Sequence, residues 1–242
     1  MRPKIVFSDF DGTLTLGESL SPILFDIFEI LQKNNIKLVP VSGRSISWGH
    51  FFLTHFPIDT VIMEGGGVIG YHNGKGLIDH EFLIDDQEIG RLEGMAMEVR
   101  KEFRGLALTA DSVGRITDRA IELSVLSELG VKSEVEKFWD KHGVSHSCSN
   151  VHMNFWCGEF SKIKAINYYL NKFEDGVKLE ECMFFGDSLN DESVFKGMPY
   201  TVGVSNISVV LNQLQHKPKV ILEGPDNAGP RGVLNHLSNV LK

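Results

Sequence analysis

Two carboxylates, Asp9 and Asp11, directly follow a short apolar segment, residues 4–8, whose composition is typical of a buried strand. Aspartates at the end of a strand can simply form a polar cap and a turn. They can also act as a nucleophile and an acid–base group beside a metal ion. The choice between these interpretations depends on which other side chains the fold brings to the same place.

The elements that would position these aspartates alternate between strands and helices. Apolar side chains recur at helical spacing over 23–31, after Ser21 as N-cap and Pro22 at the first helical position, and predict a helix with one buried face. Further strands are predicted at 36–44, 59–67, 182–187, 200–204 and 219–223. This alternation predicts an α/β fold in which helices cover both faces of a parallel sheet.

The style of the sequence changes at about residue 80. A helix at 85–103, an alternating antiparallel strand at 114–126, a helix at about 132–142 and a strand at 150–156 are predicted there. The first style resumes with a helix from about residue 161. The economical interpretation is an α/β core, residues 1–80 and 157–242, interrupted by an α+β insertion at 81–156.

Polar and charged residues gather at the carboxyl ends of the predicted core strands, where ligands bind in open parallel sheets. Besides the two aspartates they are Ser42, Gly43, Arg44, Lys162, Asp187, Asn190 and Asp191. Each of these residues alone fits a capped turn or a solvated surface. Four carboxylates, a hydroxyl, an amide and a lysine at one edge do not fit core packing, so their joint placement favours a catalytic site.

The four ordered motifs of the haloacid dehalogenase superfamily of phosphohydrolases resemble four segments of this chain: DFDGT at 9–13, SGR at 42–44, SK at 161–162 and GDSLND at 186–191. The insertion resembles the larger, type-2 cap of that superfamily. The layout is most similar to the branch of sugar-phosphate, mannosyl-3-phosphoglycerate and sucrose phosphatases. The resemblance implies a Rossmann-like parallel-sheet core with an inserted α+β cap domain that selects the substrate.

The resemblance also implies the roles of the four aspartates. Asp9 attacks phosphorus and forms an aspartyl-phosphate, while Asp11 protonates the leaving oxygen and then activates the water that releases phosphate. Mg²⁺ is the implied cofactor, because this ion prefers octahedral oxygen ligands. Its expected ligands are Asp9, Asp187 and the backbone carbonyl of Asp11, and Asp191 ligates it directly or through water.

The groups expected to bind the phosphate are Ser42, Gly43, Lys162 and Asn190. Three neighbouring residues have open roles. Thr13 either caps the following helix or braces Asp11, and Arg44 is either a member of the site or structural. In the resembled superfamily an asparagine usually follows the position of Glu64, and here Gly65 stands in that place, which leaves the role of Glu64 open.

The insertion offers three candidates for contact with the substrate. Arg119 resembles a cap arginine that some relatives use to bind an anionic substrate group, and an ion pair with Asp118 or Glu122 is the equally weighted alternative. His152 and Asn154 occupy alternating positions of the last cap strand. Closure of the cap over the core would exclude water and bring these groups to the substrate.

Two other patterns predict different chemistry and are given little weight. Gly65, Gly67 and Gly70 match the GxGxxG fingerprint of dinucleotide sites, but the residues that follow predict a hairpin with Asn73-Gly74 at its turn, where the fingerprint needs a helix. The histidines show no HExxH or similar metal-ligand spacing. The cluster His142, His146 and His152 is the remaining candidate for a second metal site.

The composition excludes several classes of partner. A net charge of −8 argues against a general nucleic-acid or anionic-membrane surface, and no apolar run reaches the ~18 residues of a membrane span. Three cysteines without a CxxC indicate neither a disulfide framework nor a zinc cluster, which suits a reducing cytoplasm. No charged and then apolar leader precedes the first strand. A small phosphorylated metabolite is the expected partner, and the expected state is a monomer or weak homodimer.

These observations predict a Mg²⁺-dependent phosphomonoesterase that acts on a sugar phosphate or a phosphoglycerate conjugate. Two alternatives stay open. A phosphomutase of the phosphomannomutase type would use the same nucleophile and return the phosphoryl group to the substrate. A non-catalytic phosphosugar-binding protein could also be built on this fold.

Overall fold

Five parallel strands form the central sheet of the computed structural model, which describes residues 2–16, 19–149 and 151–242. In spatial order they are β11 (Val220–Ile221), β10 (Thr201–Gly203), β9 (Cys182–Gly186), β1 (Ile5–Ser8) and β2 (Lys37–Pro40). Every neighbouring pair in this sheet is parallel. The predicted α/β fold with a parallel-sheet core is therefore confirmed.

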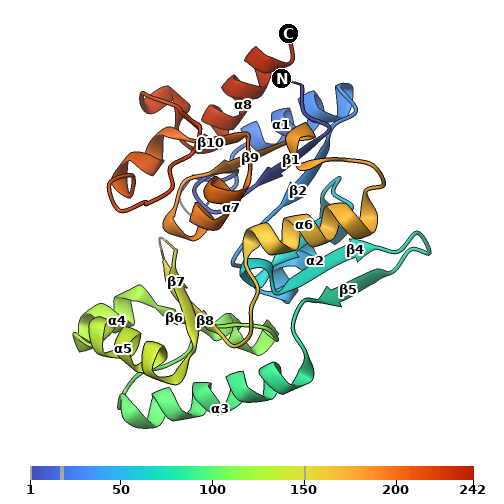
Figure 1. Ribbon diagram of the computed structural model, residues 1–242. Helices are drawn as coiled ribbons and strands as arrows, with labels where there is room; N and C mark the ends of the chain where they lie inside the picture. Colours follow the sequence, from blue (N-terminus) through green and yellow to red (C-terminus); the bar gives the residue numbers. More distant parts are fainter. Residues whose placement is uncertain (1, 17–18, 150) are drawn as a thin grey trace.

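Helices cover both faces of this sheet (Figure 1). On one face lie α1 (Ile23–Lys33), α2 (Ile46–His55) and α8 (Gly229–Val240), and on the other α6 (Lys162–Phe173) and α7 (Glu192–Gly197). Successive side chains of a strand point to opposite faces, so Val6 of β1 packs in the first layer and Phe7 in the second. Pro22 is the N-cap of α1, so the helix begins one residue later than predicted, and the Ser21 hydroxyl accepts a hydrogen bond from the Ile23 N–H.

The predicted third parallel strand is only partly a member of this sheet. β3 (Thr60–Met63) meets β2 in a single parallel bridge between Val41 and Ile62, and pairs with β4 (Val68–His72) in an antiparallel sheet completed by β5 (Ile78–Phe82). The Ser42 N–H donates to Ile62 across this bridge, so the nitrogen of Pro40, two residues earlier, also faces β3. Proline has no N–H to donate there, and the ladder stops. The β4–β5 hairpin and its turn after Asn73 are as predicted.

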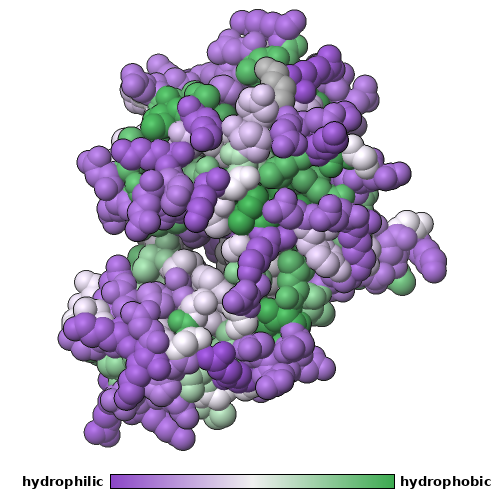
Figure 2. Space-filling model, in the orientation of Figure 1, coloured by the Kyte–Doolittle hydropathy of each residue, from purple (hydrophilic) through white to green (hydrophobic). Residues whose placement is uncertain are grey.

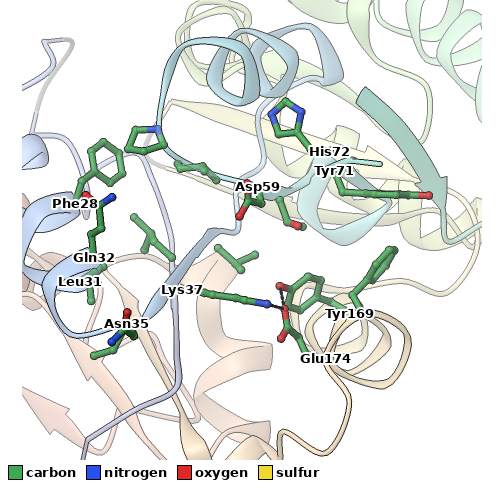
Figure 3. A pocket seen from close by; sticks show the side chains of 17 residues that line it. Phe28, Leu31, Gln32, Asn35, Lys37, Asp59, Tyr71, His72, Tyr169 and Glu174 are labelled. Carbon is green, nitrogen blue, oxygen red and sulfur yellow. Dashed lines mark hydrogen bonds and ion pairs between the residues drawn. The ribbon is translucent and has the colours of Figure 1, made fainter. Parts of the chain in front are cut away.

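Strands β2 and β3 diverge on the side of the bridge that is away from their carboxyl ends. A cavity of about 630 Å³ lies between them there (Figure 3). Its walls include Phe28 of α1, Tyr71 of β4 and Tyr169 of α6. Lys37 and Tyr169 both donate hydrogen bonds of 2.5 Å to Glu174 at its edge. The polar side chains of this edge are therefore paired with one another.

The segment between β5 and α6 forms a separate lobe below the core (Figure 1). It contains α3 (Asp86–Glu102), β6 (Arg119–Glu122), α4 (Leu123–Leu129), α5 (Lys132–His142), β7 (Ser145–Cys148) and β8 (His152–Trp156). The strands form an antiparallel sheet in the order β6-β8-β7, and their apolar side chains share a core with Leu92 of α3 and Trp139 of α5. We call this lobe the cap; its predicted boundaries at 81 and 156 stay a prediction.

Two cap elements differ from their predicted extents. The strand predicted at 114–126 spans only Arg119–Glu122, because α4 begins at Leu123. This helix ends at Leu129 and is followed by Gly130, whose φ of 66° suits a glycine C-cap. The strand predicted at 150–156 begins at His152, and Asn150 lies outside the described residues. The α5 helix matches its predicted range of 132–142.

Six single-turn 3₁₀ helices complete the secondary structure of the described residues. They are η1 (Glu64–Gly66), η2 (Ala110–Gly114), η3 (Leu179–Glu181), η4 (Leu189–Asp191), η5 (Ser205–Val209) and η6 (Pro225–Asn227). Within the same residues, no helix has the length and apolar character needed to cross a membrane.

Candidate active site

The adjacent strands β1 and β9 bring two aspartates together at their carboxyl ends. Ser8 pairs with Phe185 in the parallel ladder, so Asp9 and Asp187 leave the sheet at nearly the same height. The Asp9 N–H donates to the Phe185 carbonyl at 2.8 Å. Gly12 follows with a φ of 92°, and a Cβ atom at this position would lie 2.2 Å from an oxygen of Asp187. Glycine is thus required where the turn passes the second aspartate.

Asp191 joins these two residues from η4. The three carboxylates of Asp9, Asp187 and Asp191, which we call the site triad, are buried and have oxygens that lie within 4.8 Å of one another. Hydrogen bonds orient the second and third members. Thr13 and Asn206 donate to Asp187 at 3.3 and 2.7 Å, and the N–H groups of 187 and 188 donate to Asp191.

Lys162 provides the positive charge at the triad. It is the first residue of α6, after Ser161 as N-cap, and its ammonium group donates to Asp9 and Asp191 at 2.6 Å each and to Asn190 at 3.1 Å. Burial opposes a charged lysine, but the carboxylates of Asp191 and Asp9 outweigh it and raise the pKa of Lys162. The lysine is therefore charged at neutral pH.

One lysine does not balance three carboxylates. Burial raises the pKa of Asp9 well above its usual value; Lys162 opposes this effect, while the charges of Asp191 and Asp187 add to it. A bound cation would remove this cost, and converging carboxylate oxygens are the ligands that Mg²⁺ prefers. The donor set of the triad therefore fits a divalent metal ion.

Asp11 lies at the mouth of the site, about 40% exposed, and is held by Arg44. The guanidinium group of Arg44 donates to both carboxylate oxygens at 2.8 and 2.7 Å, a bidentate pair that fixes the plane of the carboxylate. Arg44 is thus a member of the site. The sequence left open whether Thr13 braces Asp11, and the structure places its hydroxyl on Asp187 instead.

Ser42 and Gly43 approach from the end of β2. The Ser42 N–H donates to Ile62 at 2.9 Å, and its buried hydroxyl oxygen accepts a hydrogen bond from the Arg44 N–H at 3.1 Å. Because that oxygen already accepts, the hydroxyl hydrogen is left to donate to another group. Gly43 lines the cavity in front of Asp9.

The cap closes the site from the opposite side. A cavity of about 40 Å³ lies between the aspartates and the cap residues His152 and Asn154, and a second of about 200 Å³ extends behind Asn190 toward Lys162 and Trp156. The space-filling view is hollowed where the two lobes meet (Figure 2). All nine predicted site residues of the core therefore meet at one edge, facing the cap.

The chain matches the family model of haloacid dehalogenase-like hydrolases over residues 6–93 and 117–219. It belongs to this family. The match includes all four segments that resemble the superfamily's motifs, and within the cap it leaves out residues 94–116, from the middle of α3 to shortly before β6. The chain is therefore a member of a hydrolase family, with the family's motifs at the site.

Solved structures with the same fold cover almost the whole chain at low sequence identity. Protein 0175 of Thermoplasma acidophilum has a TM-score of 0.74 and 16% identity, over 98% of this chain and 99% of its own. BT1666 of Bacteroides thetaiotaomicron has a TM-score of 0.70 and 21% identity, over 98% and 96%. The sucrose-phosphatase of Synechocystis has a TM-score of 0.68 and 16% identity, over 99% and 98%. No curated protein sequence matches the chain significantly.

Within this hydrolase fold, Arg119 does not line either cavity at the site. One nitrogen of its guanidinium group donates to the backbone carbonyls of residues 115, 116 and 118. The ion pairs considered for it are made by other residues, since Arg115 pairs with Asp118 and His152 with Glu122. That alternative is wrong for Arg119, and its contact with a substrate stays a prediction.

The structure also excludes both alternative patterns. Strand β4 follows the glycine-rich segment where a dinucleotide fingerprint requires a helix. Among the described residues, the histidines of the cap do not gather into a group that could hold a metal, whereas the site triad does. His146 contacts Asp140 instead, at 3.3 Å.

Two residues at the boundary between cap and core have contacts that the sequence did not predict: Glu64, whose role was left open, and Arg115, which was missed. Glu64 is fully buried and accepts hydrogen bonds from the N–H groups of 46 and of 116–118 and from the Thr117 hydroxyl. Arg115, not singled out in the sequence, is buried between Asp111 and Asp118. The signal for Glu64 was a charged residue at the end of an apolar strand, while Arg115 lies in a loop that gives no such signal.

Proposed function

We propose that the chain is a Mg²⁺-dependent phosphomonoesterase that hydrolyses a small phosphorylated metabolite through an aspartyl-phosphate. The observation that carries the proposal is the site triad of three buried carboxylates, two of which pair with one buried lysine, beside an Asp11 clamped by Arg44. A nucleophile, an acid–base group and a cation site at one sheet edge are what phosphoryl transfer needs.

Asp9 is the proposed nucleophile. Lys162 holds one of its oxygens, and attack by the carboxylate forms an oxygen–phosphorus bond as the bond from phosphorus to the leaving oxygen breaks. The protonated Asp11 gives its proton to that leaving oxygen. Water then forms a new bond to phosphorus, its proton passes to Asp11, and the bond to Asp9 breaks. In the structure, Arg44 holds Asp11 at the mouth of the site.

The phosphate has donors on several sides. The Ser42 hydroxyl, the Gly43 N–H, Lys162 and Asn190 are proposed to bind its oxygens, since Gly43, Lys162 and Asn190 line the cavities at the site and the buried Ser42 directly precedes Gly43. Charge-assisted hydrogen bonds of this kind are stronger than neutral ones. Together these groups would fix the phosphoryl group in line with Asp9.

Mg²⁺ would be held by Asp9, Asp187 and the backbone carbonyl of Asp11. Both oxygens of Asp191 already accept hydrogen bonds, one from Lys162 and one from N–H groups, which favours contact of Asp191 with the ion through water. The ion would neutralise the phosphate and the crowded carboxylates.

A sugar phosphate or a phosphoglycerate conjugate is the proposed substrate class. One structural neighbour is a sucrose-phosphatase solved in complex with sucrose and phosphate, and another is described as related to trehalose-6-phosphate phosphatase. The second cavity, of about 200 Å³, includes polar groups such as those of Ser147 and Asn154 in its lining, and these groups suit a hydroxylated leaving group. A reducing cytoplasm and a monomer or weak homodimer are the proposed setting and state.

The test is a panel of phosphorylated metabolites incubated with Mg²⁺, with both free phosphate and isomerised product measured. We expect free phosphate from at least one sugar phosphate or phosphoglycerate conjugate, and none from the Asp9→Asn variant. An isomer without free phosphate would replace the proposal with a phosphomutase. Saturable binding without any turnover would replace it with a phosphosugar-binding protein.

A further inference from the structure

Arg115 of the cap reaches across the boundary between the lobes to the phosphate-binding loop of the core. Its side chain is fully buried, and one guanidinium nitrogen donates to the Gly43 carbonyl at 2.9 Å. The same group is fixed inside the cap by Asp111, at 3.1 and 2.9 Å, and by Asp118, at 2.8 and 3.0 Å. A guanidinium held on this many sides can present its donor to Gly43 in one geometry only.

The Gly43 carbonyl belongs to the peptide whose other edge is the Arg44 N–H. That N–H donates to the Ser42 hydroxyl oxygen at 3.1 Å. The plane of the peptide is therefore fixed at one edge by Arg115, with a longer hydrogen bond of 3.5 Å from Asn154, and at the other edge by Ser42. The Arg44 side chain then clamps Asp11. One peptide plane thus connects a cap arginine to the hydroxyl that would bind phosphate and to the acid–base aspartate.

Glu64 makes the reciprocal connection from core to cap. Its carboxylate accepts hydrogen bonds from the N–H groups of Ile116, Thr117 and Asp118, the three residues directly after Arg115. Asn154 of the cap sheet adds a hydrogen bond of 2.7 Å to Asp118. The backbone that carries Arg115 is therefore anchored to the core at the end of β3. The β-bridge between Val41 and Ile62 connects this end of β3 to the end of β2, where Ser42 lies.

We propose that Arg115 is a positioning residue for the phosphate site. It aligns the Gly43–Arg44 peptide, so that the Ser42 hydroxyl and Asp11 have their productive orientation only when the cap is docked on the core. Arg115 itself does not touch the reacting atoms. The inference rests on the proposed phosphatase function for its kinetic consequences, whereas the alignment of the peptide can be measured without turnover.

Removal of Arg115 should weaken phosphate binding. The Gly43 carbonyl would keep only the longer hydrogen bond of 3.5 Å from Asn154, so the Ser42 hydroxyl would lose its fixed direction. We expect the inhibition constant of inorganic phosphate, measured with Mg²⁺ against an aryl phosphate, to rise about tenfold, the effect of one well-placed hydrogen bond to a charged group. Hydrogen exchange in a peptide covering residues 40–47 should become faster in the same variant.

The variants are Arg115→Met, the charge-balanced pair Arg115→Met with Asp118→Asn, and Arg115→Lys. The pair avoids an uncompensated buried carboxylate, and therefore serves if the single variant does not fold. Arg115→Lys keeps one donor for Gly43 and should recover part of the phosphate affinity. Arg91→Met is the matched control, because Arg91 also donates to two backbone carbonyls, those of His142 and Gly143, but within the cap.

A folded Arg115 variant with unchanged phosphate inhibition and unchanged exchange at 40–47 would overturn the positioning role. Equal changes in the Arg91→Met control would also overturn it, because the effect would then be a general loosening of the cap. Failure of the proposed function has a different result: wild-type protein would release no phosphate from any substrate, while the exchange difference at 40–47 would still decide the role of Arg115.

Discussion

Two clusters in this molecule each place three carboxylates near one buried basic side chain. The site triad lies at the ends of β1 and β9, where Lys162 pairs with Asp9 and Asp191. The seam cluster, which we define as Glu64, Asp111 and Asp118, lies around Arg115 between cap and core, and its member Asp111 is partly exposed. The two clusters have the same nominal charge. They differ in the hydrogen-bond donors that reach their carboxylates.

The seam cluster is completed by the protein itself. Glu64 accepts hydrogen bonds from four N–H groups and a hydroxyl, Asp118 from Arg115 and Asn154, and Asp111 from Arg115 and Thr109. In the site triad, Lys162 is the one hydrogen-bond donor to the Asp9 carboxylate among the described residues. Carboxylates that the protein fills with donors fasten two lobes, whereas a carboxylate with a single protein donor, as Asp9 has, keeps lone pairs for a cation.

The largest expected effect comes from the nucleophile. Asp9→Asn should lower turnover of an aryl phosphate by about 10³-fold or more, because an amide does not form the aspartyl-phosphate. Phosphate release under steady-state conditions measures it. Asp26→Asn, at an exposed position of α1, should keep full activity. If the Asp9→Asn variant turned over substrate at a rate close to that of the wild type, the assignment of Asp9 as the nucleophile would be wrong.

Removal of the metal should separate the two clusters. We expect EDTA to lower turnover by roughly a hundredfold or more and Mg²⁺ to restore it, because the triad needs a cation to receive a phosphate. The seam cluster is complete without an ion, so hydrogen exchange of residues 115–118 should not change with EDTA. Chelator-resistant turnover would contradict the metal site, and faster exchange at 115–118 would contradict the independence of the seam.

The sequence predicted the site triad and not the seam for a physical reason. Asp9 and Asp187 follow apolar strands, and parallel strands bring their carboxyl ends to one edge, so strand ends alone identify the group. Arg115 donates to the backbone carbonyl of Gly43 in the other lobe. Every residue type has such a carbonyl, so the sequence at position 43 does not indicate this contact. The partial separation of β2 and β3 was missed because the single proline at 40 acts through the N–H that it lacks.

Glu64 should give the protein a measurable pH dependence of stability. Burial and the charge of Asp118 raise the pKa of Glu64 to about 7 from an ordinary 4.5, against the hydrogen bonds of Thr117. The folded state then binds the proton more tightly than the unfolded state. The protonation of Glu64 therefore contributes roughly 3 kcal/mol to the free energy of unfolding. This contribution is fully present below about pH 4.5 and is lost as the pH rises through 7.

Urea unfolding of wild type and Glu64→Gln at pH 5 and pH 8 measures this contribution. The wild type should lose more free energy of unfolding between the two values than the variant, because glutamine does not titrate. The other titrating groups are common to both proteins, so the difference reports Glu64 together with its electrostatic coupling to Asp118. The exposed Glu93→Gln on α3 should behave like the wild type. Equal pH dependence in wild type and Glu64→Gln would assign the raised pKa elsewhere.

Replacement of Arg119 should have the smallest effect of these changes. It tests whether the residues around the seam cluster contribute to turnover or only to stability. Its guanidinium donates to three carbonyls of the loop that carries Arg115, so Arg119→Met should cost about 1 kcal/mol in the free energy of unfolding. Turnover of a small aryl phosphate should stay within about twofold of the wild type, because Arg119 lines neither cavity at the site. A larger loss confined to a substrate with an anionic leaving group would place Arg119 at the substrate, and a tenfold loss on the aryl phosphate itself would extend the catalytic site into the seam.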